Sequence, residues 1–201
     1  MDLNSSLEAV VRNKLLLIRH SQSQPDPARP ASQWPLSAEG RQRCGPLADR
    51  LAAYAPNAIV TSHERKAIET GALVAARLGI PAAVAGGLHE HQRDHVIWLP
   101  NPTFEQAVAT FFARPDELVF GEETADQAGA RFEASVRSIL AGHPGQTVAL
   151  VAHGTVITLF VAAHAGIAAL PFWKSLGMPA LIVMTLPNLE LLEVIERVEE
   201  I

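Results

Sequence analysis

Cysteine, positive charge and long apolar runs are all scarce in this chain of 201 residues. The single cysteine, Cys44, excludes an intrachain disulfide and fits a reducing compartment. No apolar stretch approaches the roughly 20 residues that a membrane-spanning helix needs. Residues 1–6 lack the basic start and the apolar core of a signal peptide. We therefore expect a cytoplasmic protein that does not bind a membrane.

The shortage of positive charge limits the class of partner. The chain carries 16 Lys and Arg against 21 Asp and Glu, a net charge of −5. Broad nucleic-acid binding needs a basic surface, so this composition argues against it. An acidic protein can still bind one phosphate where a few cations converge. A hydrophobic content of 48% indicates a globular chain, and its length fits one domain over residues 1–201.

Strand and helix patterns alternate along the chain, which predicts an α/β fold with a largely parallel sheet. Strands are expected at residues 14–19, 58–61, 82–84 and 147–152, with a final antiparallel hairpin at 181–185 and 191–194 around Asn188. Helices are expected at about 37–54, 64–78, 124–141 and 155–165. Ser37 is the expected N-cap of the first helix, and Gly79 ends the second.

Two irregular stretches interrupt this alternation. Residues 25–35 contain four prolines and predict a loop over the end of the first strand. Residues 86–121 hold Gly86-Gly87 and several prolines, with one short amphipathic piece near residues 104–112. We interpret 86–121 as an insertion that covers the sheet edge and shapes a substrate pocket.

Two strands end in histidine. The apolar run at 15–18 leads into Arg19-His20, and the run at 147–152 leads into His153-Gly154. Ligands of open α/β sheets bind at this carboxyl edge. His20 is a candidate nucleophile for phosphorus, and Arg19 offers a planar fork of donors for phosphate oxygens. His153 is a candidate donor to the same group, and Gly154 allows close approach at a helix N-terminus.

The strand at 58–61 is followed by a helix that opens with two adjacent cations, Arg65 and Lys66. Adjacent helical residues point about 100° apart, so we expect one of the two to face the pocket. The structural alternative is a solvated helix face on which Arg65 pairs with Glu69 at i, i+4.

A third candidate group follows the strand at 82–84. Glu90 is a candidate proton donor to a leaving oxygen, provided that its pKa is raised. The competing interpretation is a zinc site built from neighbouring side chains. Its ligands would be His89, His91, Asp94 and His95.

These motifs together resemble the histidine phosphatase superfamily, also called the phosphoglycerate-mutase-like family. "LLLIRHSQS" resembles its first strand and RHG signature, "TSHERKAIET" its second motif, "LHE" its acid motif and "VAHGTVI" its second histidine motif. The resemblance covers roughly residues 14–195. It implies a three-layer α/β/α sandwich around a mostly parallel mixed sheet with one antiparallel edge strand.

The resemblance also implies roles for individual residues. His20 would carry the phosphoryl group, Glu90 would donate the proton, and Arg19 and His153 would bind phosphate. Ser23 stands where the family has a hydroxyl residue that can touch phosphate. No metal or organic cofactor is implied.

The chain departs from the family pattern at three places. Ser21 follows the nucleophile where the family usually has glycine, and Gln22 replaces its usual acid. A serine fits there if its backbone angles are negative, at the risk of crowding the pocket. Lys66 occupies the slot of the family arginine, which variants of the family also fill with lysine. Lysine supplies a single point charge, whereas the arginine of the family supplies a planar set of hydrogen-bond donors.

The sequence therefore predicts a phosphomonoester hydrolase that acts on a small phosphorylated molecule through phospho-His20. One alternative is a mutase, which would need a closed pocket to protect the phosphoenzyme from water. Another is a binding protein that holds a phosphorylated ligand without turning it over. Such a protein would have no use for the retained proton donor, Glu90.

Overall fold

The computed structural model describes residues 13–96 and 99–198. Its strands are β1 (Lys14–Arg19), β2 (Ala58–Thr61), β3 (Ala82–Val84), β4 (Val148–Ala152), β5 (Ala180–Thr185) and β6 (Leu191–Ile195). Its helices are η1 (Ala31–Gln33), α2 (Ala38–Ala52), α3 (Arg65–Leu78), α4 (Asn101–Ala113), α5 (Ala125–Ala141), α6 (Gly154–Ala165) and α7 (Ala169–Ser175). None of the helices in these ranges is long and apolar enough to cross a membrane.

The six strands form one mixed sheet in the order β3-β2-β4-β1-β5-β6. β3, β2, β4 and β1 are parallel, while β5 is antiparallel to both β1 and β6. The expected hairpin therefore forms the antiparallel edge of the sheet. The predicted α/β class with a mostly parallel mixed sheet is confirmed.

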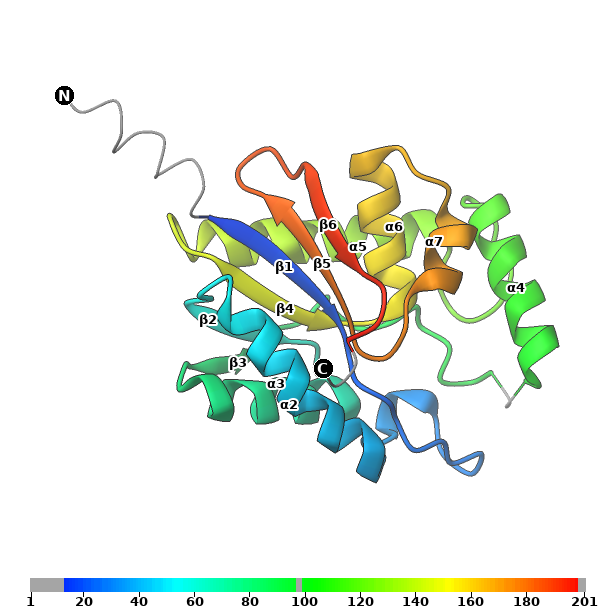
Figure 1. Ribbon diagram of the computed structural model, residues 1–201. Coiled ribbons are helices and arrows are strands. Elements are labelled where there is room, and N and C mark those ends of the chain that lie inside the picture. Colours follow the sequence, from blue (N-terminus) through cyan, green and yellow to red (C-terminus); the bar gives the residue numbers. More distant parts are fainter. Residues whose placement is uncertain (1–12, 97–98, 199–201) are drawn as a thin grey trace.

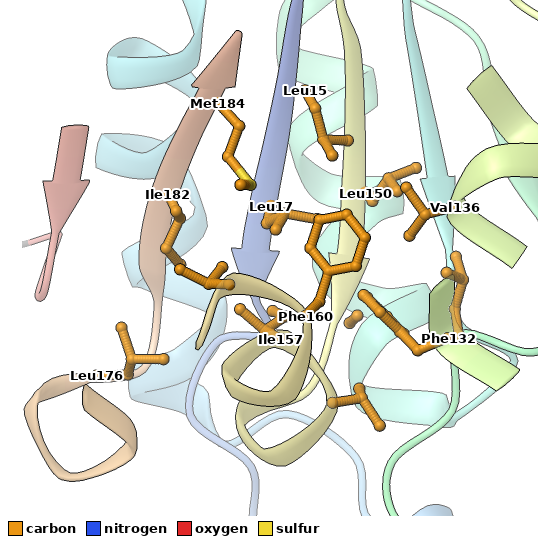
Figure 2. Close-up of a cluster of buried hydrophobic side chains, with 14 of the residues drawn as sticks. Leu15, Leu17, Phe132, Val136, Leu150, Ile157, Phe160, Leu176, Ile182 and Met184 are labelled. Carbon is orange, nitrogen blue, oxygen red and sulfur yellow. The ribbon is translucent and has the colours of Figure 1, made fainter. Parts of the chain in front are cut away.

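Two hydrophobic cores lie on opposite faces of this sheet, because successive side chains of a strand alternate between its faces. Leu15 and Leu17 pack with α5 and α6, whereas Leu16 and Ile18 pack with α2 and α3. Figure 1 shows these helix pairs on either side of the sheet, and Figure 2 shows Phe160 beside Leu17 of β1, with Phe132 next to Phe160. The result is the three-layer arrangement.

Local signals start and stop the helices as the sequence predicts. The Ser37 hydroxyl accepts the Gly40 amide at the start of α2, and Thr124 and Gln127 form a capping box on α5. Gly79 adopts a left-handed conformation (φ 68°) at the end of α3. The Ser37 cap fixes where the connection from β1 to α2 ends, and that connection lines the site.

The region after β3 is more regular than the sequence predicts. The expected short amphipathic piece is a helix of 13 residues, α4, with Pro102 in its first turn. Helix α7 was not expected, since its seven residues are too few to show a period. Both helices lie beyond α6 in Figure 1, and α4 contacts α7.

Candidate active site

A cavity of about 670 Å³ opens where the parallel strands end. The loop after β1 and the segment before α4 form its two walls, and both lie at the lower right of Figure 1. The chemistry-bearing residues in its lining are Arg19, His20, Ser23, Lys66, Glu90, Arg93 and Gly154. The structure thus brings together most of the residues that the sequence singled out.

His20 is buried at the end of β1, with 6% of its surface exposed. Its Nδ1 lies 2.7 Å from the Ser21 carbonyl oxygen, so Nδ1 carries the proton and Nε2 keeps its lone pair. Burial, then His153, Lys66 and Arg19, lower the pKa of His20 well below 6.5. The imidazole is therefore neutral at neutral pH, which is the form that a nucleophile needs.

The Ser21 side chain points away from the cavity. Its hydroxyl donates to the Gly40 carbonyl (2.7 Å) and its amide donates to the Thr70 hydroxyl (3.0 Å). Positive φ among the described non-glycine residues occurs at Ala55 and Leu189, so Ser21 fits with a negative φ. A Cβ on Gly40 would stand 2.0 Å from the Gln22 oxygen, so only glycine allows this packing. The crowding considered for Ser21 does not occur.

His153 lies fully buried beside His20, with 5.2 Å between the ring centroids. Its Nε2 is 2.9 Å from the Ser62 hydroxyl and 3.4 Å from Oε1 of Glu64. Its Nδ1 has no hydrogen-bond partner among the described residues. Burial and then Lys66 lower the pKa of His153 well below 6.5. An arriving anion would favour protonation of this ring, and Nδ1 is the nitrogen free to donate to it.

Arg19 lies across the first residue of α6. Its Nη1 donates to the Leu176 carbonyl, while its Nε is buried and makes no hydrogen bond to the described residues. A Cβ on Gly154 would stand 3.1 Å from Cζ and Nε of Arg19. Glycine at 154 therefore lets the guanidinium lie against the helix N-terminus, where backbone N–H groups also favour an anion.

The two adjacent cations of α3 separate as expected. Lys66 is buried and lines the cavity, where its Nζ donates to the Ala31 carbonyl (2.7 Å) and to Oε2 of Glu64 (2.5 Å). Arg65 is 53% exposed, and its Nε donates to Glu69 (2.9 Å). The structure therefore places Lys66 at the site and Arg65 outside it, on the solvated helix face.

Glu64 is a site residue that the sequence reasoning missed. It is 5% exposed, it pairs with Lys66, and its Oε1 accepts the Glu90 amide (2.7 Å). Burial raises its pKa, but Lys66 and the Glu90 amide outweigh burial and the net pKa is lowered. One buried carboxylate thus holds Lys66, His153 and Glu90 in place. The only sequence signal was a carboxylate two residues before Lys66.

Glu90 faces the cavity from the loop after β3. Its Oε1 accepts the His91 amide (2.9 Å) and its Oε2 accepts the Thr155 amide at the start of α6 (3.1 Å). Burial raises the pKa of Glu90, but Arg93, His153 and the His91 amide together lower it below 4.5. The condition set for Glu90 as a proton donor, a raised pKa, is therefore not met by the protein's own groups, because the cations around Glu90 stabilise its charge.

Arg131 of α5 fixes the loop that carries Glu90. Its guanidinium donates to the carbonyls of Gly87 (2.8 Å), His89 (2.9 Å) and Glu90 (3.2 Å). It also pairs with the 8% exposed side chain of Glu123 at 2.5 Å. These partners are far apart in the sequence, so no local pattern could have identified them.

The histidines considered for zinc do not converge. His91 is 3.1 Å from the Glu123 carbonyl and packs on Phe111, while His95 contacts Glu122. The ring centroids of His89 and His63 are 5.0 Å apart. No group of three or more metal-ligating side chains is found within residues 13–96 and 99–198.

Comparisons with known proteins give the family and the fold. A family model described as the histidine phosphatase superfamily (branch 1) matches residues 15–186. A search of curated proteins finds no match.

Several solved structures share the fold. A mycobacterial glucosyl-3-phosphoglycerate phosphatase is 23% identical, with a TM-score of 0.70 over 85% of this chain and 89% of that chain. An Entamoeba histolytica phosphoserine phosphatase variant bound to phosphoserine is 13% identical, with a TM-score of 0.74 over 91% and 96%. The Shigella flexneri alpha-ribazole phosphatase is 18% identical, with a TM-score of 0.67 over 92% and 96%.

Proposed function

The chain belongs to the histidine phosphatase superfamily, and we propose that it hydrolyses a small phosphomonoester through a phosphohistidine intermediate on His20. One observation carries this proposal. His20 is neutral, its Nδ1–H is held by the Ser21 carbonyl, and its Nε2 is left as the nucleophile in a cavity that also presents Arg19 and Lys66.

In the first step, Nε2 of His20 attacks phosphorus and the bond from phosphorus to the leaving oxygen breaks. Glu90 gives its proton to that oxygen, so a neutral alcohol leaves. Arg19, Lys66 and His153 hold the phosphoryl oxygens while their charge redistributes. Ser23 lines the same cavity and offers a further hydroxyl donor.

In the second step, Glu90 is a carboxylate and accepts a proton from water as the water oxygen attacks phospho-His20. The bond between nitrogen and phosphorus breaks, inorganic phosphate leaves, and His20 is neutral again. The lowered pKa of Glu90 suits this second role, because it favours the ionised form. The first step needs the opposite form, which a bound dianionic ester favours by raising the pKa of the same carboxyl group.

Hydrolysis is favoured over the mutase alternative by the names of the solved relatives, which include three phosphatases. It is favoured over a binding-only role by Glu90, because a carboxylate in a phosphate-binding cavity repels the anion unless that group takes part in proton transfer. We further propose that residues 86–121 act as the cover that shapes the pocket, since Arg93 and Phe104 line it.

The test is p-nitrophenyl phosphate turnover by the His20→Ala variant. We expect turnover to fall by at least about 10³-fold, because no other group replaces the nucleophile. His143→Ala is the matched control, since His143 lies at the C-terminal end of α5 outside the cavity lining. Undiminished turnover in His20→Ala would refute the nucleophile assignment.

A further inference from the structure

Arg93 is a cavity residue to which neither the sequence motifs nor the proposed chemistry gives a role. It lies three residues after Glu90, in the segment that leads to α4. Its Nη1 is buried and makes no hydrogen bond to any residue in the described ranges. A buried charged donor without a partner is costly, and in a folded protein it calls for an explanation.

The Arg93 guanidinium is nevertheless held in one place. Its Cζ lies 4.9 Å from the centroid of the Phe104 ring on α4, the geometry of a cation–π contact. Phe104 also lines the cavity. An arginine that stacks on an aromatic ring keeps its hydrogen-bonding edge available, and this edge can bind a carboxylate or phosphate through two parallel bonds.

The other arginines of the cavity have partners or a role. Arg19 donates to the Leu176 carbonyl and belongs to the phosphoryl site. Arg29 is exposed at the rim and pairs with Asp26 at 3.4 Å. The carboxylate of Asp94, also at the rim, accepts the Ser32 hydroxyl (2.9 Å) and is exposed. Arg93 is therefore the cation of the cavity wall that is best placed to meet an anion.

Arg93 stands on the proton-donor side of the site. It lies three residues after Glu90 in the same cavity wall, and it is the charge that most lowers the pKa of Glu90. Arg93 is a lesser cause of the lowered pKa values of His153 and Arg19, and it is not among the causes at His20, which are burial, His153, Lys66 and Arg19. Glu90 donates to the leaving oxygen in the proposed reaction, so the group next to Arg93 is the leaving group. The cavity is large enough for one, because pockets of roughly 300–1,000 Å³ take ligands of drug size.

The exposed lining of the cavity is mostly apolar. Its apolar side chains include Pro25, Pro27, Pro30, Trp34, Phe104 and Met178, and Gln22, Asp94 and Asn101 are among its polar ones. Resting on the proposed function, we propose that the substrate is a phosphomonoester whose leaving group has an apolar or aromatic body and a second anionic group, which Arg93 binds.

This contact would also assist the chemistry. Glu90 is surrounded by Arg19 from β1, Glu64 before α3, Arg93, and His153 after β4. An anion on Arg93 offsets the charge that most lowers the pKa of Glu90, so the carboxyl group is protonated more readily. Binding of the second anion therefore favours the acid form that the first step requires.

The experiment compares carboxyphenyl phosphates (ortho, meta and para) with the carbamoylphenyl phosphates of the same shape. We expect the wild-type protein to show a kcat/KM at least about tenfold higher for one carboxylate isomer than for its amide, and Arg93→Gln to reduce this ratio to near one. The matched control is Arg114→Gln, which removes an exposed charge at the end of α4 and should leave both esters unaffected.

A second readout is the pH profile. In the wild type, the alkaline limb of the kcat pH profile should lie at higher pH for the preferred carboxylate ester than for its amide. In Arg93→Gln the alkaline limbs of the two esters should coincide.

Equal kcat/KM for every isomer pair, or a preference that survives in Arg93→Gln, overturns the inference. An equal loss on both esters in Arg93→Gln also overturns it, because Arg93 would then bind the transferring phosphoryl group. Absence of turnover of any ester by the wild type would instead contradict the proposed function.

Discussion

The lowered pKa of Glu90 favours its ionised form, yet the proposed first step needs this carboxyl group protonated. The negative charge of the bound substrate reconciles these two requirements. Arg93 and His153 lower the pKa of Glu90 in the free protein, and a dianionic phosphoryl group next to them acts in the opposite direction. Substrate binding and proton donation are therefore coupled at this residue.

The role of Glu90 predicts a dependence on the leaving group. Glu90→Gln cannot protonate the leaving oxygen, so phosphorylation of His20 by an alkyl phosphate should slow by roughly 10²–10⁴-fold. Phosphorylation by p-nitrophenyl phosphate should slow far less, because p-nitrophenolate leaves without a proton. Rapid-quench measurement of the first turnover with both esters checks this. Equal slowing with the two esters would contradict the assignment of Glu90 as the acid.

Glu64 sets the charge of the phosphate site. Its carboxylate lies 2.5 Å from Lys66 and 3.4 Å from His153, so it offsets part of the positive charge that an anion would meet. We expect Glu64→Gln to strengthen binding of inorganic phosphate by about tenfold, the equivalent of roughly 1.4 kcal/mol. Competitive inhibition by inorganic phosphate measures this. Weaker inhibition would mean that Glu64 acts mainly by holding Lys66 in place.

At the scale of elements, α5 supports the site although none of its described residues lines the cavity. Arg131 on α5 binds three carbonyls of the loop that carries Glu90, and it pairs with Glu123 just before the helix. Helix α5 itself is anchored on the sheet by Phe132 and Val136 (Figure 2). The position of Glu90 therefore depends on the packing of α5 against the sheet.

Removal of this support should cost both stability and activity. Breaking a fully buried ion pair by removing one partner costs roughly 3–5 kcal/mol, and the slight exposure of Arg131 reduces our expectation for Arg131→Met to about 2–4 kcal/mol. Activity should also fall, because the carbonyls of the Glu90 loop lose the guanidinium that donates to them. The matched control is Arg137→Met on the same helix, which breaks an exposed pair with Glu133 and should change stability by less than about 0.5 kcal/mol.

The same pair predicts a pH dependence of stability. Burial raises the pKa of Glu123, but Arg131 and the Gln92 amide outweigh burial, so the net pKa lies below 4.5. The stability that this carboxylate contributes is thus present above pH 4.5 and is lost as the pH falls through its lowered pKa. The difference in unfolding free energy between wild type and Arg131→Met should shrink below pH 4.5. Denaturant titrations across this range measure it, and a constant difference would show that Arg131 does not stabilise the Glu123 charge.

For the whole molecule, the parts that could be predicted from the sequence are those with local signals. The apolar runs of β1 and β4 are buried on both faces, and caps such as Ser37 and Gly79 mark the helix ends. Helix α7 escaped prediction because it is short. The amphipathic piece expected near 104–112 makes up most of α4, and the part that was missed is the first turn, which contains the turn residues Asn101 and Pro102. The direction of the Glu90 pKa shift depends on Arg93 and His153 together, and the role of Glu64 depends on contacts with three separate segments.

The whole molecule also explains how an acidic chain can hold a phosphate. The net charge is −5, but Arg19, Lys66 and Arg93 all line one cavity at the end of the parallel strands. The fold gathers them there because the connections after β1, β2 and β3 meet at the same edge of the sheet.

The most direct test of this account is to locate the phosphoryl group on the protein. Glu90→Gln lacks the base for the second step, so it should accumulate phosphoenzyme when mixed with p-nitrophenyl phosphate. After an alkaline quench, tandem mass spectrometry should find the phosphoryl group on His20, and Glu90→Gln combined with His20→Ala should carry none. A phosphoryl group on another residue, or turnover by the wild type with no phosphoenzyme in Glu90→Gln, would contradict the central claim.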